Sequence, residues 1–189
     1  MEKILFVNAC ARSESRTLSL ARMLLDRLEG EVCEVDLYKT AFSPLDAEGM
    51  KKRDEGAKNG FSDPVFDAPK QLSQADKIVI AAPYWDLSFP SVLKTYIENV
   101  TVSGITFRYS KEGRPESLCK AGTLYYLTTS GGFIGENDFG FSYVKAVAGG
   151  FLGISDIKRY SAEGLDIFGN DADAIVENTR KQILFDLGK

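Results

Sequence analysis

The sequence predicts an α/β fold, a three-layer doubly wound sheet of five parallel strands in the order 2-1-3-4-5 with a small β-hairpin excursion. Strand-like apolar runs alternate with helix-like segments along the 189 residues, which is typical of parallel strands joined by crossover helices. Two of the runs, "KILFVN" and "KIVIAAP", alternate too little to have a solvent-facing side. With 44% hydrophobic and 26% charged residues, we expect residues 1–189 to form a single domain with one well-buried core.

The first half of the chain supplies three of the expected strands. "KILFVN" is the first, and apolar positions at helical spacing follow over residues 18–28 until Gly30 ends the helix. "EVCEVDLY" is the second strand, and the long polar connection after it has weak helical character over residues 47–57. A further helical segment runs to about Ala75 and leads into the third strand, "KIVIAAP".

The second half alternates in the same way. Pro90 opens an amphipathic helix, "SVLKTYIENV", and "GITFRYSKEGRP" is typical of a small β-hairpin. "TLYYLTT" is the fourth strand, and a Gly-rich turn joins it to a helix through "YVKAVAGGFL". "DIKRYSAEG" is the fifth strand, and residues 171–187 form a closing helix whose acidic first turn suits the helix dipole.

Composition excludes several classes of function. The chain has no histidine, so a Ser-His-Asp triad and a His-ligated metal are excluded, and we expect no metal site. A net charge of -4 offers no basic surface for nucleic acid. Three cysteines without Cys-x-x-Cys spacing favour a reducing compartment, and no apolar run is long enough to cross a bilayer. We therefore expect a cytoplasmic protein without a membrane span.

Five strands favour the flavodoxin-like strand order over the six-stranded dinucleotide-binding one. In such sheets a ligand binds outside the carboxyl ends of the strands, where the strand order reverses between the first and third strands. The informative residues should therefore follow "KILFVN", "KIVIAAP" and "TLYYLTT".

The loop after the first strand, "ACARSESRT", predicts a phosphate site. It has no glycine, which excludes the Gly-x-Gly-x-x-Gly turn and the Walker loop. Hydroxyls, arginines and the amides of a following helix N-terminus are the groups that bind a terminal phosphate. They are supplied here by Ser13, Ser15, Thr17, Arg12 and Arg16. For this loop alone the alternative is equally good, namely that Ser15 or Thr17 only caps the helix and the arginines are solvated.

Two further loops predict contacts to a flat ring. Tyr84 and Trp85, the only tryptophan, follow the third strand, where aromatic side chains pack on a conjugated ring. The alternative is that Trp85 is a core or interface anchor. Gly131 and Gly132 follow the fourth strand with a backbone free to adopt positive φ, although an ordinary tight turn would also use glycine. Taken together, the three loops fit flavin mononucleotide (FMN).

At these residues the chain resembles the FMN-dependent NADH:quinone oxidoreductases and azoreductases of the flavodoxin-like superfamily. The resemblance covers most of the length, and its most specific block is "APYWDLSFPSVLKTYIENVTVSGITFRY". It implies a homodimer with FMN near the interface, in which hydride passes from NADH or NADPH to flavin N5 and two electrons then pass to a quinone or azo compound by a ping-pong route. No side chain is expected to be catalytic. The cofactor-binding residues that the resemblance implies are Cys10, Ser15, Arg16, Thr17, Tyr84, Trp85, Asp86, Leu87, Thr129, Ser130, Gly131 and Gly132, and Arg12 joins them from the loop's own chemistry.

Three features depart from the family pattern. Cys10 stands where the family commonly has a serine, and a thiol is a poorer donor to phosphate, so binding leans more on Arg12 and Arg16. Asp86 stands where the family usually has an asparagine. A carboxylate there either opposes the anionic reduced flavin or turns away from it. The segment "SPLDAEGMKKRDEGAKNGFSDP" is individual in composition, so the acceptor is the least transferable property.

Two other functions stay open on the sequence alone. A one-electron flavodoxin-type carrier would have a strongly acidic surface and a phosphate loop with glycine, and neither is seen here. A flavin-free sensor or scaffold on the same fold would not take up FMN. Cys10 at a helix N-terminus has no partner base, which disfavours a catalytic thiol.

Overall fold

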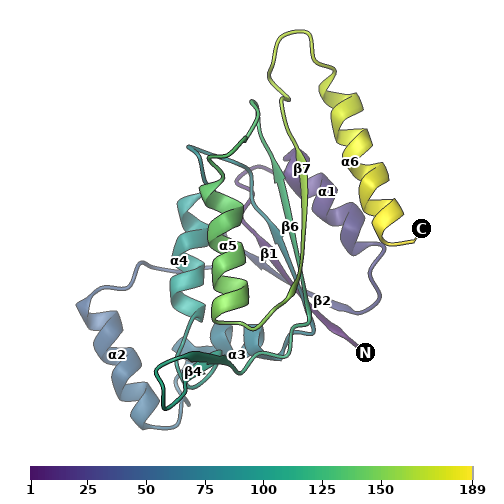
Figure 1. The fold of residues 1–189 in the computed structure, drawn as a ribbon. Helices are drawn as coiled ribbons and strands as arrows, with labels where there is room; N and C mark the ends of the chain where they lie inside the picture. Colours follow the sequence, from purple (N-terminus) through teal and green to yellow (C-terminus); the bar gives the residue numbers. More distant parts are fainter. Residues whose placement is uncertain (189) are drawn as a thin grey trace.

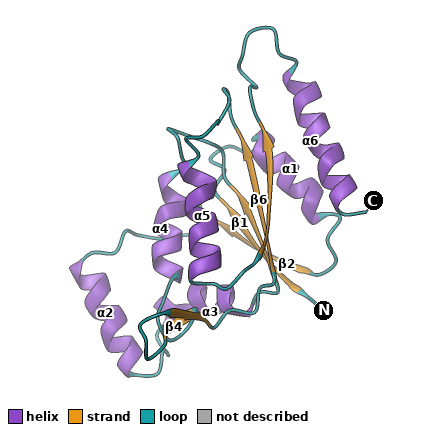
Figure 2. Ribbon diagram, viewed as in Figure 1, coloured by secondary structure: helices purple, strands orange, loops and turns teal. Residues whose placement is uncertain are grey.

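The computed structural model describes residues 1–188 and has the predicted strand order. Five parallel strands form one sheet in the order β2-β1-β3-β6-β7, which is 2-1-3-4-5 for the strands of the main sheet (Figures 1 and 2). Its strands are β1 (Lys3–Asn8), β2 (Glu31–Asp36), β3 (Lys77–Ala81), β6 (Thr123–Thr129) and β7 (Asp156–Ala162). The strands at "KILFVN" and "TLYYLTT" have the predicted bounds, and the other three are shorter than predicted at their carboxyl ends.

Helices cover both faces of the sheet. One face carries α1 (Arg16–Leu25) and α6 (Ala172–Asp186), and the other carries α3 (Asp67–Gln74), α4 (Ser91–Val100) and α5 (Phe139–Gly150) (Figure 1). Side chains of β1 alternate between the two resulting cores. Leu5 and Val7 lie in the core under α3, α4 and α5, whereas Ile4 and Phe6 lie in the core under α1 and α6. This explains why "KILFVN" lacks a polar alternation, because both of its faces are buried.

The long polar connection forms α2 (Ala47–Lys58), which stands away from the sheet (Figure 1). Gly56 is its only buried residue, and it packs against the ring of Phe66. A β-carbon at this position would lie 2.6 Å from that ring. Phe66 ends the short 3-10 helix η1 (Pro64–Phe66) that precedes α3. This close contact and the hydrogen bonds from the Arg53 guanidinium to the Glu98 and Thr101 carbonyls anchor the helix, while most of α2 is exposed.

The predicted hairpin consists of β4 (Phe107–Tyr109) and β5 (Pro115–Ser117), paired antiparallel. It lies at the amino end of the main sheet, away from the loops at the carboxyl ends (Figure 1). The Ser117 hydroxyl donates to the Leu152 carbonyl just after α5 at 2.7 Å, which fixes the hairpin there. Within residues 1–188, every helix is too short or too polar to cross a membrane.

Candidate functional site

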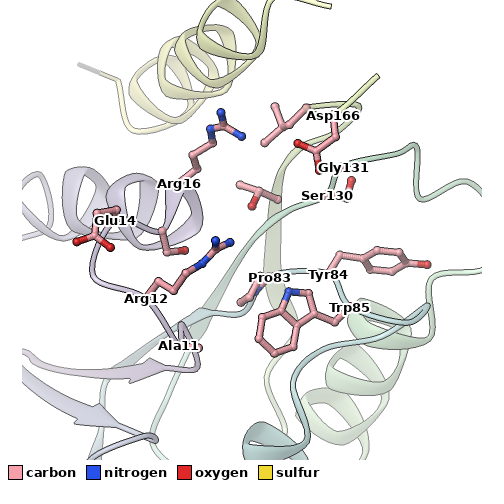
Figure 3. A pocket seen from close by; sticks show the side chains of 13 residues that line it. Ala11, Arg12, Glu14, Arg16, Pro83, Tyr84, Trp85, Ser130, Gly131 and Asp166 are labelled. Carbon is pink, nitrogen blue, oxygen red and sulfur yellow. The ribbon is translucent and has the colours of Figure 1, made fainter. Parts of the chain in front are cut away.

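The carboxyl ends of β1, β3, β6 and β7 meet around one cavity of about 490 Å³. The sheet register continues into the loops, since Tyr84 N–H donates to the Thr129 carbonyl at 2.9 Å and Ser130 N–H donates to the Ala162 carbonyl at 3.0 Å. The volume falls within the range of about 300–1,000 Å³ that is usual for small-molecule sites. The lining residues are Ala11, Arg12, Glu14, Ser15, Arg16, Pro83, Tyr84, Trp85, Thr129, Ser130, Gly131, Leu165 and Asp166 (Figure 3).

The first wall of the cavity is the N-terminus of α1. Ser15 is the N-cap, and its hydroxyl oxygen accepts the Leu18 N–H at 3.3 Å, which leaves the hydroxyl proton free to be donated. The N–H groups of Arg16 and Thr17 lie in the first turn of α1, where no helical carbonyl precedes them by four residues, so they have no backbone partner within residues 1–188. The capping role and the phosphate role are therefore compatible.

Both arginines of this wall carry free positive charge. Over residues 1–188, neither the Arg12 nor the Arg16 guanidinium makes an ion pair or a hydrogen bond to another side chain, and both side chains are exposed. In Figure 3 they extend into the cavity from the α1 side. Two unpaired cations beside a helix N-terminus form a site for a multiply charged anion.

The second wall is a tight hairpin turn after β3. Trp85 N–H donates to the Ser88 carbonyl at 2.9 Å, and Ser88 N–H donates to the Trp85 carbonyl at 2.8 Å. The two central residues, Asp86 and Leu87, have φ of 49° and 67°, the conformation that a two-residue turn normally gives to Asn-Gly. The strained turn leaves the indole of Trp85 44% exposed, and Figure 3 shows it at the cavity with Tyr84 beside it.

The loop after β6 is tied to this turn. The Tyr84 hydroxyl donates to the Asn137 carbonyl at 2.8 Å, and Phe139 N–H donates to the Leu87 carbonyl at 3.1 Å. Behind it, the Glu163 carboxylate accepts the Ile134 N–H at 2.9 Å. The aromatic turn and the glycine turn therefore form one connected rim.

The third wall pairs Gly131 with Asp166. Contrary to the sequence expectation, neither Gly131 nor Gly132 adopts a positive φ. Gly131 instead leaves room for the Asp166 carboxylate, since a β-carbon there would lie 2.4 Å from Asp166 Oδ2 and would make that side chain move. Asp166 N–H donates to the Gly131 carbonyl at 2.9 Å, and Leu165 N–H donates to the Ser130 carbonyl at 3.1 Å, so the loops after β6 and β7 run side by side.

The structure brings together eight of the thirteen residues that the sequence indicated for cofactor binding, namely Arg12, Ser15, Arg16, Tyr84, Trp85, Thr129, Ser130 and Gly131. The other five do not line this cavity. Thr17 is buried, and its hydroxyl bonds the Thr129 hydroxyl at 2.7 Å. Asp86 and Leu87 lie exposed at the tip of the hairpin turn, and Gly132 is exposed next to Gly131. Whether the Asp86 carboxylate opposes the anionic reduced flavin or turns away from it stays a prediction.

Cys10 also lies outside this cavity. Its N–H donates to Asn8 Oδ1 at 3.0 Å, and its thiol lies 3.7 Å from the Ala81 carbonyl. Burial raises the pKa of the Cys10 thiol to about 11, which keeps it protonated at neutral pH. Because a protonated, buried thiol is a poor nucleophile, this geometry agrees with a structural role.

Sequence reasoning missed five lining residues, which are Ala11, Glu14, Pro83, Leu165 and Asp166. The first three belong to the two loops that were considered. Leu165 and Asp166 follow the fifth strand, and its carboxyl end reaches the same edge of the sheet as the others. The position of these two residues after a parallel strand was the signal that could have identified them.

Comparison with known proteins agrees with the fold. A protein-family profile described as flavodoxin-like fold matches residues 2–185. The chain is 36% identical to an FMN-dependent NADH:quinone oxidoreductase 2 of Clostridium acetobutylicum over 95% of this chain and 94% of that protein. It is 37% identical to an FMN-dependent NADH:quinone oxidoreductase of Lachnoclostridium phytofermentans over 96% of both chains.

A solved structure agrees with these sequence relatives. The crystal structure of an azoreductase from Bacillus anthracis superposes with a TM-score of 0.85 at 26% identity, over 99% of both chains. By fold and by full-length sequence similarity, the chain belongs to the flavodoxin-like fold family and, within it, to the family of FMN-dependent NADH:quinone oxidoreductases.

Proposed function

We propose that residues 1–189 form one FMN-binding domain that transfers two electrons from NADH or NADPH to a quinone or an azo compound by a ping-pong route. The observation that carries this proposal is the cavity itself. It joins two unpaired guanidiniums and a free helix N-terminus to an exposed indole and a peptide turn. The names of the full-length relatives point to the same cofactor and donor.

The residues of the cavity fit FMN in two parts. A phosphate dianion suits Arg12, Arg16 and the Ser15 hydroxyl, with the amides of the first turn of α1 completing the shell. A flat heterocycle suits the Trp85 indole on one side and the peptide groups at Gly131 on the other. Gly131 adds no side chain that would fill this space.

FMN bound by these residues would supply the two-electron redox chemistry between the nicotinamide and the acceptor, so the protein would need no acid or base of its own for the redox step. The chain's residues bind and orient. Arg12 and Arg16 hold the phosphate end, and the rim formed by the two connected turns holds the ring end. This division explains how a chain without histidine supports the chemistry.

We also propose that the protein is a homodimer with FMN near the interface. Large apolar side chains are exposed in the turn after β3 and between β6 and the start of α5, namely Trp85 at 44%, Leu87 at 51%, Phe133 at 74% and Phe139 at 59%. The two segments are tied together by the hydrogen bond from Phe139 N–H to the Leu87 carbonyl, and exposed apolar side chains that gather in this way favour an interaction site. The cytoplasm is the proposed compartment, because all three cysteines are free thiols.

The experiment is an anaerobic visible spectrum of the FMN-reconstituted protein, first with NADH and then with a simple benzoquinone. We expect NADH to bleach the flavin bands and the quinone to restore them, with no one-electron-reduced species accumulating. If FMN binds but neither NADH nor NADPH bleaches the bands, the carrier function replaces the proposed one. Failure to bind FMN would favour the flavin-free sensor or scaffold.

A further inference from the structure

Asp166 is the carboxylate that lines the cavity without a partner. Of the two acidic residues in the lining, Glu14 accepts the Ser13 hydroxyl at 2.6 Å. The Asp166 side chain makes no ion pair and no hydrogen bond to any described residue. Its backbone N–H donates to the Gly131 carbonyl. Figure 3 shows its carboxylate beside Gly131, on the side of the cavity away from Arg12.

The position of Asp166 is fixed by its backbone. The loops after β6 and β7 are joined by the hydrogen bonds from Gly164 to Gly132, from Leu165 to Ser130 and from Asp166 to Gly131, at 3.1, 3.1 and 2.9 Å. Oδ2 comes so close to Gly131 that any β-carbon at that residue would displace it. The chain thus sets a negative charge directly beside the peptide turn that is proposed to contact the flavin ring.

A carboxylate beside the flavin ring would favour a ring N–H over a ring carbonyl, and the neutral ring over the anionic one. An ionised carboxylate only accepts hydrogen bonds, so it fits an N–H of the ring and repels the ring's carbonyl oxygens. It also disfavours any negative charge that the ring gains on reduction. The side chain at 86, which the sequence suggested for such an effect, lies at the tip of the hairpin turn outside the cavity lining.

We propose that Asp166 is a cofactor-tuning residue, which accepts the imide N–H of the flavin ring and lowers the reduction potential of the bound flavin. This inference rests on the proposed function. The hydrogen bond and the charge are separable effects, because asparagine keeps an acceptor oxygen and loses the charge, whereas alanine loses both.

The first test measures the two-electron reduction potential of bound FMN in the unaltered protein and in Asp166→Asn. We expect Asp166→Asn to favour reduced over oxidised FMN by about tenfold, a rise of about 30 mV for a two-electron couple. Asp173→Asn is the matched control, since Asp173 is an exposed aspartate in the first turn of α6 and lies outside this cavity. A potential that is the same in all three proteins would overturn the inference.

The second test measures dissociation constants for FMN and for FMN methylated at the imide nitrogen. We expect the unaltered protein to prefer FMN by at least about tenfold, the scale of one charge-assisted hydrogen bond, and Asp166→Ala to lose most of that preference. An equal preference in both proteins would contradict the assigned hydrogen bond. If the unaltered protein binds neither flavin, the proposed function fails and this inference fails with it, whereas FMN binding with unchanged selectivity refutes the inference alone.

Discussion

The phosphate site predicts a specific interaction between two arginines and one end of the cofactor. Replacing Arg12 or Arg16 by alanine removes a guanidinium that has no other partner within residues 1–188. A hydrogen bond to an ionised group contributes about 1.5–3 kcal/mol, and the exposure of both side chains favours the lower value. We therefore expect each substitution to weaken FMN binding roughly tenfold, since 1.4 kcal/mol is tenfold in affinity.

The assay compares FMN with riboflavin, which has the same ring and ribityl chain but no phosphate. Titrations followed by flavin fluorescence give dissociation constants for both ligands in the unaltered protein, Arg12→Ala, Arg16→Ala and the control Arg27→Ala. Arg27 is exposed just after α1 and lies outside the cavity. We expect riboflavin affinity to change less than about twofold in every variant, because the lost contact is to the phosphate. If FMN and riboflavin lose affinity equally, the arginines do not bind phosphate and the placement of the cofactor is wrong.

Three further predictions concern stability. Leu87→Gly should raise the free energy of unfolding by about 1 kcal/mol, because a leucine at φ 67° is strained and its exposed side chain packs little. Urea denaturation measures this change, and an unchanged or lower free energy of unfolding would refute the strain. Gly56→Ala should lower it by about 1–3 kcal/mol through overlap with Phe66, whereas Gly122→Ala, whose added β-carbon meets nothing within 4 Å, should change it by less than about 0.5 kcal/mol. Equal effects of the two alanines would show that the Phe66 contact does not anchor α2. The folded protein holds the Cys10 proton up to about pH 11, whereas the unfolded chain releases it near pH 9. Stability should therefore fall as the pH rises from 9 to 11, and Cys10→Ala should make this fall less steep. A slope identical in both proteins would contradict this.

The fold followed from the sequence because its signals are local. The runs "KILFVN" and "TLYYLTT" become strands with the predicted bounds, and "SVLKTYIENV" becomes α4 with Pro90 as its N-cap. Burial on both faces removes the polar alternation from a central strand, and proline fixes where a helix begins. The strand order also followed, since handedness and strand number leave few arrangements.

The site followed only in part because some of its contacts join distant segments. The sequence indicated glycine at 131 for a backbone conformation, but in the structure it leaves room for the Asp166 carboxylate, which comes from a different loop. The side chains at 86 and 87 were expected at the ring, but both residues lie at the tip of a tight turn and neither lines the cavity. Neither the approach of two loops nor the sense of a turn can be read from residue types alone.

The central claim is that FMN occupies the cavity between α1 and the hairpin turn after β3, and the only tryptophan of the chain lies in its lining. The most direct measurement is a titration of the apoprotein with FMN in which the emission of Trp85 is followed, because an aromatic ring packed on the indole quenches it. We predict saturable quenching that ends at one FMN per chain. Flavin binding that leaves the tryptophan emission unchanged, or no saturable binding at all, would contradict the account.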